Sequence, residues 1–331
     1  MNAFGIDLGT SNIKLYNGNN DSYFMEKNMI AVEGRDNILA YGDSAFEMYE
    51  KAPENINISF PLTNGVIADI GNMQMLMKYF ADDLFKGKIK PADYFIAVPT
   101  DVTDVERRAF YELVKTAGIK AQNVYVVEKA VADGLGMDID VKTSQGVLVV
   151  DIGFDTTEIS ILSLGGIVVS RLLKTGGNKF DEAIKNAVRK EYGLVIGSKT
   201  SEKVKYAIRD MENLGKDAIV YGRDIVSGLP VEKAISLDLV YDSLNELFIQ
   251  IIENVKSILE RTPPELGADI YRNGIYLTGG ASQIDYFAGM LGDATGLNVN
   301  MADEPMATVI KGLATIIKNK KYASLAFSVE E

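Results

Sequence analysis

The stretch Gly5-Ile6-Asp7-Leu8-Gly9-Thr10-Ser11-Asn12-Ile13-Lys14-Leu15-Tyr16 decides the fold of this chain. It opens with apolar residues, breaks at Gly9-Thr10-Ser11, and continues with alternating apolar and polar residues, a pattern typical of a strand, a tight turn and a second strand. The pattern recurs where Val147–Ile152 is followed by Gly153 and by an alternating run that begins at Thr156. We interpret the two copies as an internal duplication, with one hairpin in each half of the chain.

A third element of this kind follows the apolar run that ends at Leu277, which leads into Thr278-Gly279-Gly280-Ala281-Ser282. Glycines at such turns let backbone N–H groups approach a phosphate, and nearby hydroxyls add further donors. Asp7 and Asp151 each end a strand, and a hydrated magnesium ion needs only one or two such carboxylates. The three turns, in this order, predict a cleft that binds phosphate and magnesium.

Composition restricts the chemistry available in such a cleft. The chain has 331 residues, a net charge of −12, no cysteine and no histidine. Disulfides, thiolate catalysis and zinc–sulfur sites are therefore excluded, and so is the usual general base. Carboxylates, hydroxyls, lysines, backbone amides and a bound hard cation remain, which suits magnesium–phosphate chemistry. The acidic balance argues against direct binding of nucleic acid.

Strand and helix patterns alternate between the three turns. Residues 94–98 and 124–127 have the pattern of buried strands, and Thr103-Asp104-Val105-Glu106 is a capping box that predicts a helix start. Further helices are predicted at about 129–136, 178–191, 201–211, 237–261 and 307–317. This alternation, in a chain long enough for two lobes, predicts an α/β protein.

The motifs resemble the actin, Hsp70 and sugar-kinase superfamily, and over nearly the whole chain they look like the MreB family of bacterial actins. The similarity rests on the three turns and on three further stretches, which are Pro61-Leu62-Thr63-Asn64-Gly65-Val66-Ile67, Gly176-Gly177-Asn178-Lys179-Phe180-Asp181-Glu182-Ala183-Ile184 and Arg261-Thr262-Pro263-Pro264-Glu265-Leu266. The Ser-Asn-Ile-Lys run at 11–14 looks more like the plasmid-segregating actins of the ParM type.

The resemblance implies an α/β fold of the actin-like ATPase type, in which two lobes enclose a nucleotide cleft. Each lobe would have a ribonuclease-H-like core and a smaller subdomain. Lobe I would span residues 1–142, with its small subdomain within about 31–75 and a C-terminal helix, 307–331, returning to it. Lobe II would span residues 143–306, with its small subdomain within about 178–238.

The resemblance also implies where ATP or ADP and Mg²⁺ would bind. Glu128 would be the catalytic carboxylate that activates water, and Asp151 and Thr156 would assist it. A magnesium ion would be held through water by Asp7 and Asp151. The residues expected to contact the nucleotide are Thr10, Ser11, Asn12, Lys14, Gly153, Phe154, Asp155, Glu202, Lys205, Gly279, Gly280, Ala281 and Ser282.

Several of these residues have a plainer interpretation without the resemblance. Glu202 and Lys205 also fit a solvated helix face, Glu128 fits a surface residue at a helix start, and Lys14 fits an outward-facing strand lysine equally well.

Three positions depart from the family pattern. Lys129-Ala130 stands in place of an acidic residue and a proline, Gly153-Phe154-Asp155 in place of three glycines, and Ala281 in place of a third glycine. These changes bear on hydrolysis rate and nucleotide affinity more than on the fold.

The leading functional hypothesis is a weak ATPase that assembles into homopolymer filaments for cell-shape maintenance and for the organisation of cell-wall synthesis. The alternatives are a ParM-like or magnetosome-type filament that positions plasmids or organelles, and a small-molecule kinase of the same fold. We expect a cytoplasmic location, since no leader and no run of about 18 apolar residues is present. Apolar residues and lysines within 80–89 predict contact with the inner membrane face, where transmembrane adaptors of the cell-elongation machinery would be partners, or else a helix packed in its own lobe.

Overall fold

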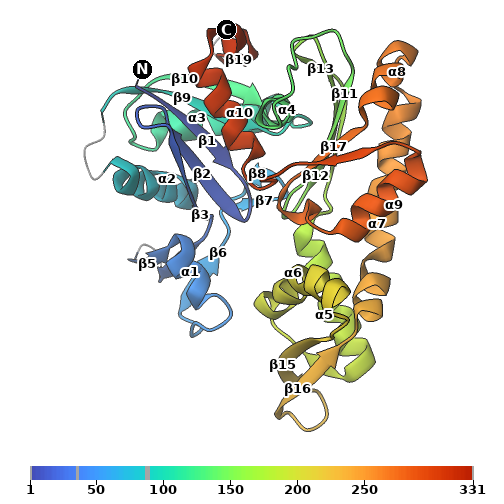
Figure 1. Ribbon diagram of the computed structural model, residues 1–331. Coiled ribbons are helices and arrows are strands. Elements are labelled where there is room, and N and C mark those ends of the chain that lie inside the picture. The colour runs from blue at the N-terminus through green and yellow to red at the C-terminus, as the bar shows by residue number, and fades with distance from the viewer. Residues whose placement is uncertain (1, 35–36, 86–89, 330–331) are drawn as a thin grey trace.

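The computed structural model describes residues 2–34, 37–85 and 90–329, and Figure 1 shows that they form two α/β halves side by side. Each half is built on one large sheet, and two smaller parts extend from the same end of the molecule. The α/β prediction is confirmed.

The first half contains a six-stranded sheet. Its strands are Ala3–Leu8 (β1), Asn12–Asn17 (β2), Ser22–Lys27 (β3), Ala92–Val98 (β9), Ala121–Glu128 (β10) and Ala326–Phe327 (β19). Their order across the sheet is β19-β10-β9-β1-β2-β3. β1 and β2 form the antiparallel hairpin expected from the sequence, with Asp7 opposite Lys14, and β1 pairs in parallel with β9. All six residues of β1 are buried, as is typical of a strand covered on both faces.

The second half repeats this arrangement in a five-stranded sheet. Its strands are Val147–Ile152 (β11), Thr157–Ser163 (β12), Gly166–Leu173 (β13), Ile275–Thr278 (β17) and Val299–Met301 (β18), in the order β13-β12-β11-β17-β18. β11 forms an antiparallel hairpin with β12 and pairs in parallel with β17. The hairpin with a parallel neighbour therefore occurs once in each sheet, so the predicted duplication is present in the fold.

Helices cover the outer faces of the two sheets (Figure 1). They are Ile70–Phe85 (α2) and Asp104–Thr116 (α3) on the first sheet, and Leu237–Glu260 (α7), Pro264–Asn273 (α8) and Asp285–Thr295 (α9) on the second half. The capping box predicted at the start of α3 is present, because the Thr103 side chain accepts from the Glu106 N–H and the Glu106 carboxylate accepts from the Thr103 N–H.

Two helices, Lys129–Gly136 (α4) and Thr308–Lys318 (α10), cross closely between the sheets. Buried residues of both helices belong to one apolar cluster, which also contains Ala3 of β1 and Val149 of β11. The helix expected over 307–331 ends at Lys318. The chain continues as a 3₁₀ segment, Lys320–Leu325 (η2), and then as β19, which pairs with β10 in the first sheet.

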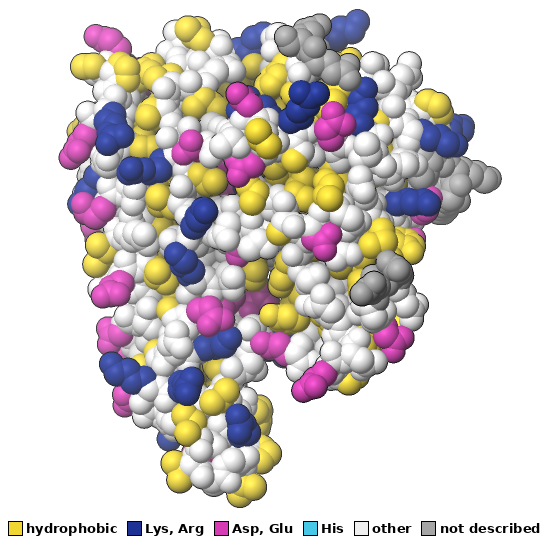
Figure 2. Space-filling model, turned by 180° about the vertical axis from the view of Figure 1, so that it is seen from behind, with side chains coloured by type: hydrophobic (Ala, Val, Ile, Leu, Met, Phe, Trp, Pro, Cys, Tyr) yellow, Lys and Arg dark blue, Asp and Glu magenta, His cyan; other side chains and the backbone are white. Residues whose placement is uncertain are grey.

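The two smaller parts each combine a small sheet with helices. The first contains Ile30–Glu33 (β4), Asn37–Tyr41 (β5), Gly42–Met48 (α1) and Ile56–Ser59 (β6), followed by the short hairpin Leu62–Thr63 (β7) and Val66–Ile67 (β8). The second contains Gly177–Tyr192 (α5), Leu194–Val195 (β14), Ser198–Leu214 (α6), Ala218–Asp224 (β15) and Pro230–Ile235 (β16). Figure 2 shows a notch between the two parts.

Acidic and basic side chains are interspersed on the face shown in Figure 2, without a continuous basic area. Among the described helices, none combines the length and the apolar character that crossing a membrane requires.

Candidate functional site

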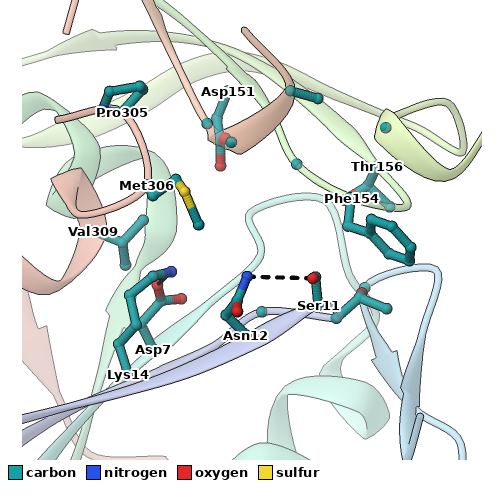
Figure 3. Close-up of a pocket in the computed structure, with 18 of the residues that line it drawn as sticks. Asp7, Ser11, Asn12, Lys14, Asp151, Phe154, Thr156, Pro305, Met306 and Val309 are labelled. Atoms are coloured by element: carbon teal, nitrogen blue, oxygen red, sulfur yellow. Dashed lines mark hydrogen bonds and ion pairs between the residues drawn. The ribbon is translucent and has the colours of Figure 1, made fainter. Parts of the chain in front are cut away.

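A cavity lies where the turns after β1, β11 and β17 meet between the two sheets. In Figure 3, Asp7, Asn12 and Lys14 lie on one side of the open space, with Asp151 across from them. The predicted site residues that line the cavity are Asp7, Thr10, Ser11, Asn12, Lys14, Asp151, Gly153, Phe154, Thr156, Glu202, Lys205, Gly279, Gly280 and Ala281. The structure thus brings together most of the side chains that the sequence singled out.

The two hairpin turns have the same backbone geometry. The N–H of Gly9 donates to the carbonyl of Asn12 at 3.0 Å, and the N–H of Gly153 donates to the carbonyl of Thr156 at 2.8 Å. At Gly9 a side chain would be too close, since a Cβ atom there would lie 2.8 Å from the Asn12 oxygen. This tight turn leaves backbone groups at the cavity wall, as an anion-binding turn requires.

Lys14 points into the cavity and pairs with Asp7. Its Nζ lies 2.6 Å from Asp7 Oδ2, and the two side chains are 10% and 4% exposed. The alternative of an outward-facing strand lysine is therefore wrong. The ammonium is placed where it meets both the Asp7 carboxylate and any anion that enters the cavity.

Lys129 forms the second ion pair of the cavity and was missed by the sequence prediction of site residues. Its Nζ is paired with Asp151 Oδ2, and its side chain is 19% exposed. Lys129 is the first residue of α4 and lines the cavity. The one signal in the sequence was the departure from the family pattern at 129–130, which marked the position as unusual without indicating its partner.

Further carboxyl groups surround Lys129. Burial raises the pKa of Asp133 well above its usual range, and the nearby charge of Asp151 raises it further. Burial also raises the pKa of Glu158, against the opposing effect of Lys129. For Lys129 itself, burial alone would lower the pKa, but the charges of Asp151, Glu158 and Asp133 outweigh that effect and raise it. The ammonium is thus the positive centre of an acidic neighbourhood.

Glu128 does not line the cavity, although it directly precedes Lys129. Its Oε1 lies 3.2 Å from Arg107 Nη1, and its side chain is 21% exposed. Burial raises the pKa of Glu128 to about 7, an effect that Arg107 opposes and Glu158 reinforces. The carboxylate expected to activate water is therefore directed toward α3, and Lys129 occupies the cavity side of this segment.

The far end of the cavity is formed by α6. Lys205 is 4% exposed, so it does not belong to a solvated helix face, and its Nζ donates to Asp181 Oδ2 at 2.9 Å and to the Gly177 carbonyl at 3.2 Å. Glu202 also lines the cavity, and its carboxylate lies 3.9 Å from Lys27 of the first half.

Besides Glu128, two predicted site residues lie just outside the cavity. Asp155 accepts hydrogen bonds from the Asn64 N–H at 2.8 Å and from Asn178 Nδ2 at 3.1 Å, and it lines a neighbouring hollow between the two smaller parts. Ser282 is fully buried, and its hydroxyl donates to the Gly279 carbonyl at 2.8 Å within the short 3₁₀ turn Gly280–Ser282 (η1).

Gly279 allows Asp151 to reach its position. Its φ is +92°, and a Cβ atom there would lie 2.1 Å from Asp151 Oδ1. Glycine is therefore required both by the backbone conformation and by the space that the carboxylate fills.

Some cavity-lining residues were not predicted from the sequence. They include Pro305 and Met306 before α10, Val309 in α10 and Tyr206 in α6. Figure 3 shows Met306 and Val309 beside the open space. Apolar side chains give this wall a surface suited to a flat, partly apolar group. No motif marked them, because single apolar residues near a helix start are most often core.

The paired hairpins, their parallel neighbours and the cavity between the two sheets define an actin-like ATPase fold. The chain belongs to the MreB/Mbl family, since the family model described as MreB/Mbl protein matches residues 1–324. It is 34% identical over 319 residues to the cell shape-determining protein Mbl of Bacillus subtilis (strain 168), with 95% of each chain covered. It is 32% identical over 320 residues to the cell shape-determining protein MreB of Escherichia coli (strain K12), with 94% of this chain and 92% of the relative covered.

Solved structures agree with this family. MreB 5 of Spiroplasma citri bound to AMPPNP is 35% identical, covers 97% of each chain and has a TM-score of 0.90. The ADP-bound MreB5 of the same organism has a TM-score of 0.86. The MamK double helical filament, at 22% identity and a TM-score of 0.78, shows the shared fold. The MreB interpretation thus holds over the ParM-like one suggested by residues 11–14.

Proposed function

We propose that this chain is an ATP- and ADP-binding bacterial actin whose filaments maintain cell shape and organise cell-wall synthesis. The observation that carries the proposal is the meeting of three glycine-containing turns, from both halves of the chain, around one cavity. Family membership and the nucleotide-bound MreB5 structures support it. We divide the chain into lobe I, residues 1–142 with the returning C-terminal segment, and lobe II, residues 143–306.

We assign the phosphates to the two hairpin turns. Thr10, Ser11 and Asn12 on one side, and Gly153, Phe154 and Thr156 on the other, present backbone N–H groups and hydroxyls toward the cavity. Lys14 supplies a positive charge at the same end. We assign the adenosine to the wall formed by Glu202, Lys205, Gly279, Gly280 and Ala281, with Met306 and Tyr206 beside it. The buried Ser282 hydroxyl supports this wall from behind, because it donates to the Gly279 carbonyl.

Weak hydrolysis of ATP coupled to polymerisation is part of the proposal. Asp151 and Thr156 line the cavity, whereas Glu128, the predicted water-activating group, faces Arg107. Phosphate release from Glu128→Ala, compared with parent protein at equal nucleotide occupancy, tests that assignment. Unchanged turnover would remove Glu128 from the mechanism.

A magnesium ion at Asp7 and Asp151 stays a prediction from the sequence. Among the described residues, no group of three or more Asp, Glu, His or Cys side chains has the geometry of a metal site. Both aspartates are already paired with lysines, so their charge does not call for a divalent ion.

Self-assembly is the partner interaction that we propose first, with a cytoplasmic location and with membrane adaptors as later partners. Phe80 was one of the apolar residues within 80–89 that predicted contact with a membrane. It is fully buried in the apolar cluster of the first half, so its side chain is not available for that contact. Residues 86–89 of that segment lie outside the described residues, as do the side chains of Leu84 and Phe85.

High-speed pelleting with negative-stain microscopy tests the proposed function. Purified protein is compared with ATP, with ADP and without nucleotide. We expect filaments that depend on ATP, because a nucleotide bound between the two halves fixes their relative orientation. The protein would fail to assemble over a range of salt, protein concentration and added lipid if the filament proposal were wrong. If it also transferred phosphate to a small acceptor, the small-molecule kinase would be the better proposal.

A further inference from the structure

Two of the carboxylates that line the cavity, those of Asp7 and Asp151, each have a cation supplied by the chain. Lys14 Nζ lies 2.6 Å from Asp7 Oδ2, and Lys129 Nζ is paired with Asp151 Oδ2. The aspartate side chains are 4% and 5% exposed, so water neutralises little of their charge. The four groups together carry no net charge, and an incoming polyphosphate therefore meets two ammonium groups that balance the two carboxylates.

The position of Lys129 is fixed by its surroundings. It is the first residue of α4, and α4 is pressed against α10 so closely that a Cβ atom on Gly312 would lie 1.8 Å from the Ala132 oxygen. Separating this partly buried ammonium from Asp151 would leave a carboxylate that is 5% exposed without a partner, which is unfavourable. The ion pair is thus part of the folded cavity and does not depend on a ligand to form.

A divalent cation at Asp151 would meet the like charge of Lys129 at contact distance. Charges of equal sign at such separations repel strongly where water is largely excluded. The ammonium, by contrast, offers up to three N–H donors and can contact a phosphate oxygen while it remains near Asp151. The lysine therefore supplies at this point the positive charge that phosphate binding requires.

We propose that Lys129 is a resident cation of the nucleotide cavity, which neutralises Asp151 and makes the binding of ADP and ATP nearly independent of Mg²⁺. This inference rests on the nucleotide binding proposed above and adds the cation requirement of that site. The affinity for ADP tests it, and neither ATP hydrolysis nor filament assembly needs to be measured.

The experiment is calorimetric titration of the full-length protein with ADP, once in excess Mg²⁺ and once in excess EDTA. For the parent we expect the two dissociation constants to agree within about threefold, because the cavity is neutral without a divalent ion. For Lys129→Met we expect binding in EDTA to be weaker than in Mg²⁺ by about tenfold or more, because Asp151 then repels the phosphates. Lys129→Arg keeps the charge and should restore the parent ratio.

The matched control is Lys256→Met, which removes a lysine paired with Glu253 on the exposed surface of α7 and should leave both constants unchanged. A parent protein whose ADP affinity falls tenfold or more in EDTA overturns the inference, and this result needs no variant to fold. Equal Mg²⁺ dependence in parent and Lys129→Met also overturns it. No binding of ADP in either buffer overturns the proposed nucleotide site, and this inference with it.

Discussion

The backbone N–H of Asn64 donates a hydrogen bond of 2.8 Å to the carboxylate of Asp155 and thereby joins the two halves of the molecule. Asn64 and Gly65 have φ values of +51° and +80°, as in the tight turn that an Asn-Gly pair forms between two short strands. Next to it, the rings of Phe60 and Phe154 lie 5.7 Å apart. The two residues that replace family glycines, Phe154 and Asp155, are therefore used for contact between the halves.

We predict that Asp155→Ala destabilises the protein by about 1–3 kcal/mol, because the Asn64 N–H then loses its acceptor in a half-buried place. The measurement is the urea midpoint in the absence of nucleotide. Asp155→Asn is the matched control, since its side-chain carbonyl can still accept from the Asn64 N–H, although its amide replaces the oxygen that accepts from Asn178, so it should preserve part of the stability. Equal midpoints for parent and Asp155→Ala would show that the contact between the halves contributes nothing to folding.

We predict that stability depends on pH through Glu128. Burial raises the pKa of Glu128 from 4.5 to about 7, so between these values the folded state holds a proton that the unfolded state has released. The contribution of this proton to the free energy of unfolding is complete below pH 4.5 and is lost as the pH rises through 7. Glu128→Gln does not titrate, so relative to the parent it should gain about 2 kcal/mol between pH 5 and pH 8. Urea denaturation at both pH values measures this difference, and parallel profiles would contradict the raised pKa.

Local features of the fold were predictable from the sequence, whereas contacts between distant segments were not. The turn at Gly9 and the cap at Thr103 depend on a few neighbouring residues, and both occur as expected. The pairing of Lys129 with Asp151 depends on how α4 meets β11, which no periodic pattern encodes.

The same reason explains why Glu128 was placed in the cavity. A strand end followed by a helix start leaves two adjacent residues facing different ways, and only the packing of α3 and its Arg107 decides which of them faces the cavity. The glycine contact between α4 and α10 was also invisible, because a glycine inside a helix pattern does not say what approaches it.

We predict that Asp133→Asn is tolerated at neutral pH. Asp133 is buried, its pKa is raised well above the usual range by burial and by Asp151, and the Thr308 hydroxyl donates to its Oδ1 at 2.6 Å. A neutral side chain of the same shape keeps this hydrogen bond, so the cost should be below about 1 kcal/mol. Asp133→Ala removes the acceptor and should cost about 2–3 kcal/mol. Thermal unfolding at pH 7 compares the two, and an Asn variant as unstable as the Ala variant would mean that Asp133 is needed as a carboxylate.

We predict that Gly312→Ala destabilises the protein by about 3 kcal/mol or more, because the helix backbones of α4 and α10 must separate. A Cβ atom at this position would lie 1.8 Å from the Ala132 carbonyl oxygen, and backbone atoms cannot rotate away as a side chain can. The matched control is Gly289→Ala in α9, where a Cβ atom meets nothing within 4 Å and where alanine should add about 0.5–1 kcal/mol. Urea denaturation measures both variants. Since α4 begins at Lys129, the shifted helix should also weaken ADP binding. A Gly312→Ala protein as stable as Gly289→Ala would show that the close crossing does not hold α4 in place.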